Sequence, residues 1–232
     1  MIMITSSTLN FLTALSQNNS KQRMDKNRDR YYESKQEIIL ISKKLIELIS
    51  EFDPHIAWAN LDPKKSIFRI NRYRRFWKNK SPYKENFGIS ISPGGRRSEY
   101  ASYYLHIQPW WKSSLWWWIW SPSKEAIELI RENILDDRSR FKDIIRNDDF
   151  VRMYMELKWK SLVRPPKWFQ EYKDDAAMTY IKMKDRHVSR PLLDDQVMWS
   201  QLIDLCRLWF ETLHPFNSWI NEFIQEIDEM QN

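Results

Sequence analysis

The sequence predicts an α+β fold in which helices at both ends of the chain pack on an antiparallel sheet of about four to six strands. Apolar residues recur at helical spacing in residues 8–50 and again after residue 121, whereas residues 66–120 are rich in strand formers and alternate between apolar and polar. Connections between the alternating stretches are short, as in consecutive antiparallel strands. With 232 residues the chain can bury a sizeable core, and we interpret residues 1–232 as a single domain.

The first part of the chain is predicted to be helical. Residues 8–16 place three leucines on one face of a short helix, and Asn18-Asn19 is a turn signal. Residues 21–50 carry the buried stripe of a longer helix. The two Asp-Pro pairs in residues 53–63 then bracket a loop.

Strands are expected in the middle of the chain. Residues 66–71 are rich in β-formers, and apolar and polar residues alternate strictly in 88–92. Residues 93–95, Pro-Gly-Gly, form a turn signal. A half-buried strand at 103–108 and a further strand at 115–120 follow.

The last part returns to helices. Ser121 is a plausible N-cap because proline follows it at the first helical position. A second helix is expected over 141–155 and one more strand over 179–184. Two terminal helices, at 195–213 and 217–230, complete the prediction.

Composition excludes several classes of protein. The single cysteine, Cys206, cannot form an internal disulfide, so we expect a reducing, cytoplasmic location. The longest apolar run, 115–120, is too short for a membrane span, and the N-terminus lacks the pattern of a signal peptide. The four histidines show no metal-ligand spacing, and no nucleotide-binding or zinc-protease motif occurs, so neither a metal nor a cofactor is expected.

Glycine is scarce and tryptophan abundant. The chain has 3 glycines and 13 tryptophans, whereas glycine usually makes up about 7% of a soluble chain. Several tryptophans stand where turns would favour glycine, as in Pro109-Trp110-Trp111. Two explanations remain open. The protein is a Trp-rich one with aromatic core strands, or its UGA codons were translated as Trp although they specify Gly in the genetic code of the source.

Positive charge is concentrated in one segment. Residues 61–100 hold eleven Lys and Arg against three carboxylates, a net charge of +8, which leaves −2 for the rest of the chain. Here cations alternate with aromatics, and arginine forks bind phosphate or carboxylate while aromatic rings can stack a base. We therefore predict that this segment and a nearby histidine bind a ligand through Arg69, Arg72, Arg75, Lys80, Tyr83, Lys84 and His106.

The same segment resembles the uncharacterised family known as domain of unknown function 2461. The family's arginine-rich strand end and its Pro-Tyr-Lys motif match Phe68, Arg69, Ile70, Arg72, Arg75, Phe76, Lys80, Pro82, Tyr83 and Lys84. The likeness continues through 103–107 and 164–167 and covers nearly the whole chain. It implies a fold and the place of a site, but the family name implies no activity.

Two kinds of departure from the family pattern matter. Tyr73 and Asn79 stand where the family has aspartates, so a role for those carboxylates as charge partners is lost here. The family has glycine, or at 77 a small residue, where this chain has Trp77, Trp110, Trp111, Trp116, Trp117, Trp118 and Trp168. A reassigned UGA codon explains all of these positions with one cause, and this favours glycine over an aromatic binding platform.

Three functions remain open. The first is recognition of a phosphate-bearing or other anionic ligand, either a small molecule or nucleic acid, with strong salt dependence in the case of nucleic acid. The second is a hydrolase or transferase in which the arginines hold an anionic substrate and His106 or Tyr83 moves protons. The third is a structural network in which the arginines and lysines pair with the acidic C-terminal helices. No residue has an assignable catalytic role.

Overall fold

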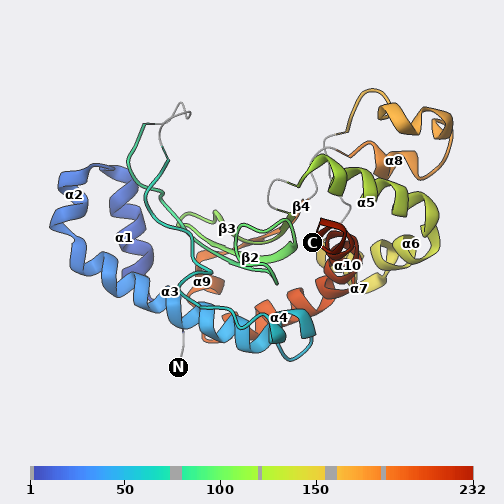
Figure 1. The fold of residues 1–232 in the computed structure, drawn as a ribbon. Coiled ribbons are helices and arrows are strands. Elements are labelled where there is room, and N and C mark those ends of the chain that lie inside the picture. Colours follow the sequence, from blue (N-terminus) through green and yellow to red (C-terminus); the bar gives the residue numbers. More distant parts are fainter. Residues whose placement is uncertain (1–2, 74–79, 120–121, 155–160, 184–186, 232) are drawn as a thin grey trace.

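A computed structural model confirms the α+β fold: a four-stranded antiparallel sheet from the middle of the chain lies between N-terminal and C-terminal helices (Figure 1). It describes residues 3–73, 80–119, 122–154, 161–183 and 187–231. Within these ranges, no helix is long and apolar enough to cross a membrane.

The N-terminal region is helical as predicted, but in four pieces. These are α1 (Ser6–Gln17), α2 (Lys21–Lys26), α3 (Arg28–Ile49) and α4 (Pro54–Trp58). The predicted helix over 21–50 is interrupted at Asn27, which ends α2 and precedes α3. The loop predicted after residue 53 is instead the short helix α4, because the Asp53 carboxylate accepts the His55 N–H at 3.0 Å and proline occupies the first turn.

The sheet has the strand order β1-β2-β3-β4, with every neighbouring pair antiparallel. Its strands are β1 (Phe87–Ile91), β2 (Ala101–Ile107), β3 (Ser113–Ile119) and β4 (His187–Leu192). The prediction missed β4. The strand predicted at 66–71 forms only two isolated bridges, Ile67 with Ile89 and Asn71 with Tyr83, so this segment accompanies β1 without joining the sheet as a regular strand.

The strand predicted at 179–184 is wrong. Residues Met178–Ile181 form the short helix α8, and Met183 makes an isolated bridge to Ser161. The Asp175 carboxylate accepts the Ala177 N–H at 2.8 Å and so favours a helical start at this point.

The other C-terminal helices are α5 (Lys124–Asp136), α6 (Arg138–Arg146), α7 (Asp148–Tyr154), the 3₁₀ helix η1 (Lys167–Tyr172), α9 (Asp194–Val197) and α10 (Leu202–Gln231). Ser123, rather than Ser121, caps α5 by accepting the Ala126 N–H at 3.1 Å, and Ser121 lies outside the described residues. The helix predicted over 141–155 is two helices, since the Asn147 side chain accepts N–H groups of the first turn of α7.

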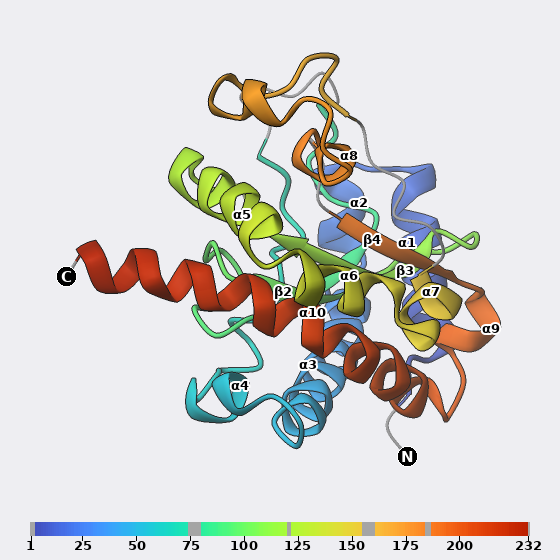
Figure 2. The same ribbon diagram turned by 90° about the vertical axis from the view of Figure 1, so that its right-hand side faces the viewer.

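The sequence predicts a break in the last helix at Pro215, and the structure has none. α10 continues through this proline for 30 residues. Leu213 and Phe216 are both buried on either side of it, so tertiary packing holds the helix together where local propensity favours a break. Along its length α10 contacts α3, α5, α6 and α7 (Figure 2).

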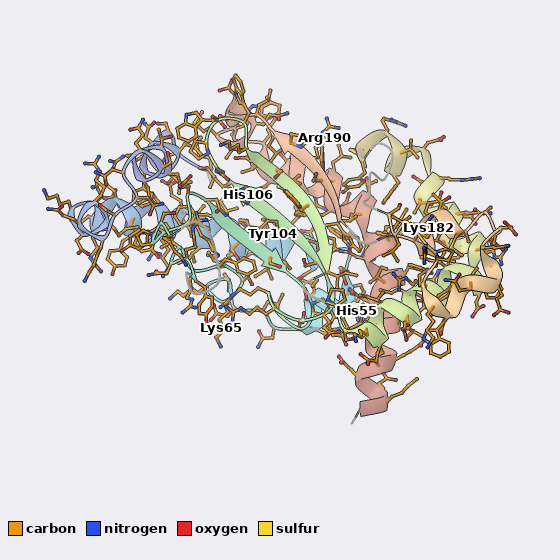
Figure 3. The ribbon with its side chains drawn as sticks, turned by 90° about the horizontal axis from the view of Figure 1, so that it is seen from above. His55, Lys65, Tyr104, His106, Lys182 and Arg190 are labelled. Atoms are coloured by element: carbon orange, nitrogen blue, oxygen red, sulfur yellow. The ribbon has the colours of Figure 1, made fainter. Side chains whose placement is uncertain are left out.

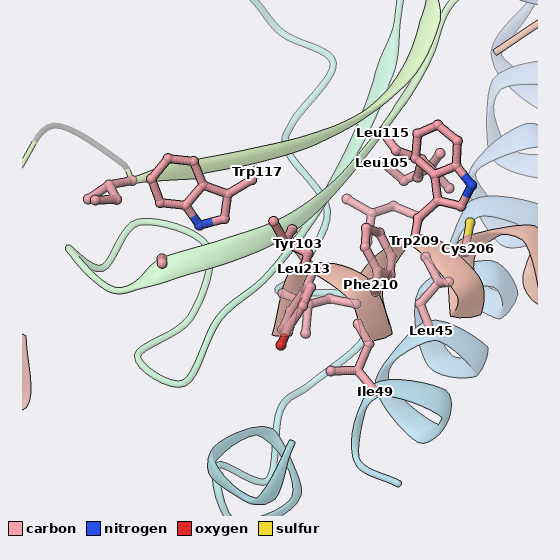
Figure 4. Packing of buried hydrophobic residues seen from close by; sticks show 14 of the residues in the cluster. Leu45, Ile49, Tyr103, Leu105, Leu115, Trp117, Cys206, Trp209, Phe210 and Leu213 are labelled. Carbon is pink, nitrogen blue, oxygen red and sulfur yellow. The ribbon is translucent and has the colours of Figure 1, made fainter. Parts of the chain in front are cut away.

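The two faces of the sheet differ. One face packs on α3 and α10, and its core residues include Leu45 and Ile49 of α3, Tyr103, Leu105, Leu115 and Trp117 of the sheet, and Cys206, Trp209, Phe210 and Leu213 of α10 (Figure 4). The opposite face, which we call the open face, carries Gly88, Ser90, Tyr104, His106 and Trp116. Gly88 and Ser90 of this face are buried, and Tyr104, His106 and Trp116 are partly exposed.

The turn between β2 and β3 has an unusual backbone. Trp110 and Trp111 both have positive φ, 63° and 59°, and their side chains are exposed. Their N–H groups each donate to the carboxylate of Asp194 at 3.0 Å. Consecutive left-handed residues suit two-residue hairpin turns, where glycine or asparagine normally occupies such positions.

Candidate anion-binding pocket

The basic segment is fixed against β1 by backbone hydrogen bonds. The N–H of Arg72 donates to the carbonyl of Pro82 at 2.8 Å, and the N–H of Lys84 donates to that of Ile70 at 2.7 Å. These bonds join the strand-like segment 66–73 to the chain that leads into β1. Arg72 and Lys84 therefore project from a paired backbone, not from a free loop.

A pocket of about 500 Å³ lies between this segment and the loop that connects β1 to β2. Five cations line it, and they are Arg69, Arg72, Lys84, Arg96 and Arg97. Two aromatic and two amide side chains complete the lining, and no carboxylate belongs to it within the described part of the chain. A concave site of this size suits a small molecule.

The five cations line one pocket although no carboxylate among the described residues pairs with them. None of the ion pairs in the described residues includes any of the five. Burial, followed by the charges of Arg72 and Arg69, lowers the pKa of Lys84. Burial, followed by the charge of Arg97, likewise lowers the pKa of Arg96. The fold thus disfavours the charged forms of these side chains, and a bound anion would reverse that effect.

Some of the cations are also anchored. The Nε of Arg72 donates to the Tyr83 carbonyl at 3.2 Å, and the Lys84 ammonium lies 5.1 Å from the centre of the Phe68 ring. Arg96 donates through Nη1 to the Lys65 carbonyl, whereas its Nε is buried and has no acceptor among the described residues. An unsatisfied buried donor is unfavourable and marks a place for an acceptor.

Glycine shapes the loop that carries Arg96 and Arg97. Gly95 has a φ of +83°, and a Cβ on Gly94 would lie 2.5 Å from the Cβ of Ser98. Both positions therefore require glycine, one for its backbone angle and the other for space. This turn directs the two arginines back toward the basic segment.

His106 lies beside the pocket on the open face, next to Tyr104 on the same strand (Figure 3). Its Nε2 is 2.9 Å from Oε1 of Gln108, and its Nδ1 is 3.4 Å from both the Asn86 amide and the Tyr104 hydroxyl. Burial is the main cause of its lowered pKa, and the Lys84 charge contributes. Burial thus favours the neutral form of His106, and both its nitrogens have partners, none of them a carboxylate among the described residues.

The predicted ligand-binding residues have different places in the structure. Arg69, Arg72 and Lys84 line the pocket, and His106 reaches it through Asn86. Tyr83 is buried in the core, where the Asn19 side chain brackets its backbone with bonds of 3.0 and 3.1 Å. Lys80 is exposed and does not belong to the lining, while Arg75 lies outside the described residues.

Sequence reasoning missed Arg96 and Arg97. The signal was present in the Pro93-Gly94-Gly95 turn, which ends a strand and is followed at once by two arginines. Their approach to Lys84 depends on how the loop folds back, which local sequence does not specify. Among the described residues, no group of three or more His, Cys, Asp or Glu is arranged to hold a metal ion.

Comparison with known proteins gives one relationship. Residues 7–219 match the family described as "Conserved hypothetical protein (DUF2461)". Searches of curated proteins and of solved structures gave no match. Because the family match extends over most of the chain, from the first helix into α10, the chain belongs to the DUF2461 family.

Proposed function

We propose that the basic pocket binds a phosphate-bearing or similar anionic ligand. The observation that carries this proposal is the convergence of five cations on one pocket of about 500 Å³ with no carboxylate in its described lining. Guanidinium groups bind phosphate oxygens in pairs, and the bonds are stronger when the donor is charged. Burial and, after it, repulsion from the neighbouring arginines lower the pKa of Lys84, and a bound anion would offset both effects.

Two alternative functions receive less support. A structural network would have the pocket arginines paired with acidic C-terminal helices, but Glu222 pairs with Arg140 and Glu211 with Arg207. A hydrolase or transferase would place a carboxylate next to His106, whose described partners are neutral. Binding is the function that the contacts of the described residues favour.

Calorimetric titration with pyrophosphate at constant ionic strength tests this proposal. We expect Arg69→Gln to weaken binding about tenfold or more, since it removes one charge-assisted contact. Arg152→Gln is the matched control, because Arg152 is an exposed arginine on α7, which packs near β4 at the opposite edge of the sheet. Equal losses in both variants, or no binding by the wild type, would refute the proposal.

We also propose that Trp110 and Trp111 are glycines in the natural protein, encoded by a reassigned UGA. Their consecutive positive φ angles support this, because a left-handed conformation is unfavourable for tryptophan by about 1–2 kcal/mol per residue. Sequencing the codons at 77, 110, 111, 116, 117, 118, 159 and 168 is the test. UGA at these positions, with in-frame UGA at glycine positions of flanking genes, supports the proposal, and UGG overturns it.

A further inference from the structure

A second cavity adjoins the basic pocket. It measures about 640 Å³ and lies between the β1–β2 loop and the chain that follows α4. Arg96 and Arg97 line both cavities, so the two share a wall. Lys65 adds a further cation to the second cavity, and Figure 3 places it at the margin of the sheet on the side of the basic segment.

The buried Nε of Arg96 belongs to this shared wall. Nη1 of this guanidinium donates to the Lys65 carbonyl. Nε still has no acceptor within the described part of the chain. An oxygen of a ligand that extends from one cavity toward the other would satisfy this donor.

The two cavities together carry more positive charge than one phosphate group can neutralise. Their described lining contains six cations and one carboxylate, that of Asp62, which already accepts the Lys64 N–H at 2.8 Å. A single phosphate monoester carries about two negative charges, and most of the excess would remain. Two or three linked phosphoryl groups would match it.

We propose that the ligand carries two or more linked phosphoryl groups, one held by Arg69, Arg72 and Lys84 and the next reaching Arg96 and Arg97 at the shared wall. This inference rests on the proposed function and narrows it to a class of small polyanions, such as the diphosphate or triphosphate part of a nucleotide. Within the described residues these cations line two adjoining cavities, which favours a compact polyanion over a nucleic-acid strand.

The test is a calorimetric series on the full chain with inorganic phosphate, pyrophosphate and tripolyphosphate at one ionic strength. We expect affinity to rise about tenfold or more at each added phosphoryl group, since each adds charge-assisted bonds. Arg97→Gln should weaken tripolyphosphate binding about tenfold and phosphate binding by a clearly smaller factor, because a single phosphoryl group can still be held by Arg69, Arg72 and Lys84. Arg97 is exposed, so this variant should fold even if Arg96→Gln does not. Arg152→Gln is again the control.

Each other outcome has a distinct meaning. Equal affinity for the three anions overturns the polyanion proposal and leaves the proposed function standing. Absence of binding by all three overturns both. If a single-stranded oligonucleotide binds more tightly than tripolyphosphate, with a steep salt dependence, the small-molecule class is wrong and anion binding remains.

Discussion

Charged groups have different surroundings on the two sides of the sheet. On the buried face, Asp53 is almost inaccessible, yet it accepts hydrogen bonds from the Tyr103 hydroxyl at 2.9 Å and the His55 N–H at 3.0 Å. Its carboxylate also lies 3.6 Å from Nδ1 of His214. Beside the open face, Lys84 and its neighbouring arginines contact carbonyls or the Phe68 ring, but no carboxylate lines their pocket among the described residues.

The pKa shifts of Asp53 and Lys84 reflect this difference in surroundings. Burial alone would raise the pKa of Asp53, but the nearby His214 and the hydrogen bond from Tyr103 outweigh it, and the pKa is lowered. Burial and neighbouring arginines lower the pKa of Lys84. A lowered pKa favours the charged form of a carboxyl and disfavours that of an amine. The protein therefore stabilises the buried charge of Asp53 itself, whereas the described residues provide no carboxylate partner for the pocket cations.

The largest expected effect comes from breaking the apolar packing of the buried face. Leu105→Ala removes a side chain that is 1% exposed and should lower the free energy of unfolding by about 3 kcal/mol. Urea denaturation measures this change. Leu40→Ala on α3, where the side chain is 50% exposed, is the control and should change it by less than about 1 kcal/mol. Similar losses in the two variants would contradict the assigned core.

Removing the charge of Asp53 should have the next largest effect. Asp53→Asn should lower the free energy of unfolding by about 2 kcal/mol at pH 7, because it disturbs a satisfied buried network. A carboxyl with a lowered folded-state pKa stabilises the protein above its unfolded pKa, about 3.9, and loses this contribution as pH falls through the folded value. The deficit should therefore shrink in urea titrations at pH 3.

The exposed Asp136→Asn substitution is the control for this pH dependence. It should change the free energy of unfolding by less than about 0.5 kcal/mol at either pH. A deficit for Asp53→Asn that is as large at pH 3 as at pH 7 would mean that packing, not charge, explains the loss.

The β2–β3 turn sharpens the comparison, because here a gain in stability is expected. Trp110→Gly and Trp111→Gly should each raise the free energy of unfolding by about 1 kcal/mol through relief of the left-handed strain. Trp219→Ala is the contrasting control, since Trp219 is fully buried against Phe141 and Phe223 and its loss should destabilise the protein. Thermal denaturation compares the three, and a loss of stability in both turn variants would contradict the strain argument.

Local sequence predicted much of the fold and part of the site. Periodicity identified α1, the first three strands and the terminal helical region because each buries a regular apolar stripe. It missed β4, whose residues include Arg190 and Pro191 and whose strand conformation comes from pairing with β3. It also predicted a break at Pro215, which long-range packing prevents.

The same limit applies to the pocket. Arg69, Arg72 and Lys84 were predicted because they lie close together in one basic segment. Arg96 and Arg97 were not, since a folded-back loop more than ten residues later brings them to the same hollow. Tyr83 is the opposite case: it was predicted to bind the ligand because it lies in the basic motif, but it is packed into the core.

The smallest expected effect is on the free energy of unfolding when Lys84 is replaced, and here the sign of the change matters more than its magnitude. Lys84→Gln removes an uncompensated charge, so in the absence of ligand it should leave the free energy of unfolding equal to or slightly above that of the wild type, by less than about 1 kcal/mol. Salt should diminish this gain, because it screens the repulsion between Lys84 and the arginines. Denaturation at low and high salt measures it, and a clear loss of stability would contradict the view that Lys84 is uncompensated.

The most direct test of the central claim is urea denaturation of wild type and Lys84→Gln, each with and without pyrophosphate at constant ionic strength. A ligand that binds only the folded state stabilises it according to its concentration and affinity. We predict that the order of stability reverses: the variant equals or exceeds the wild type without pyrophosphate, and the wild type exceeds the variant with it. An unchanged order, or equal stabilisation of both proteins, would contradict the claim that the pocket cations are kept for an anionic ligand.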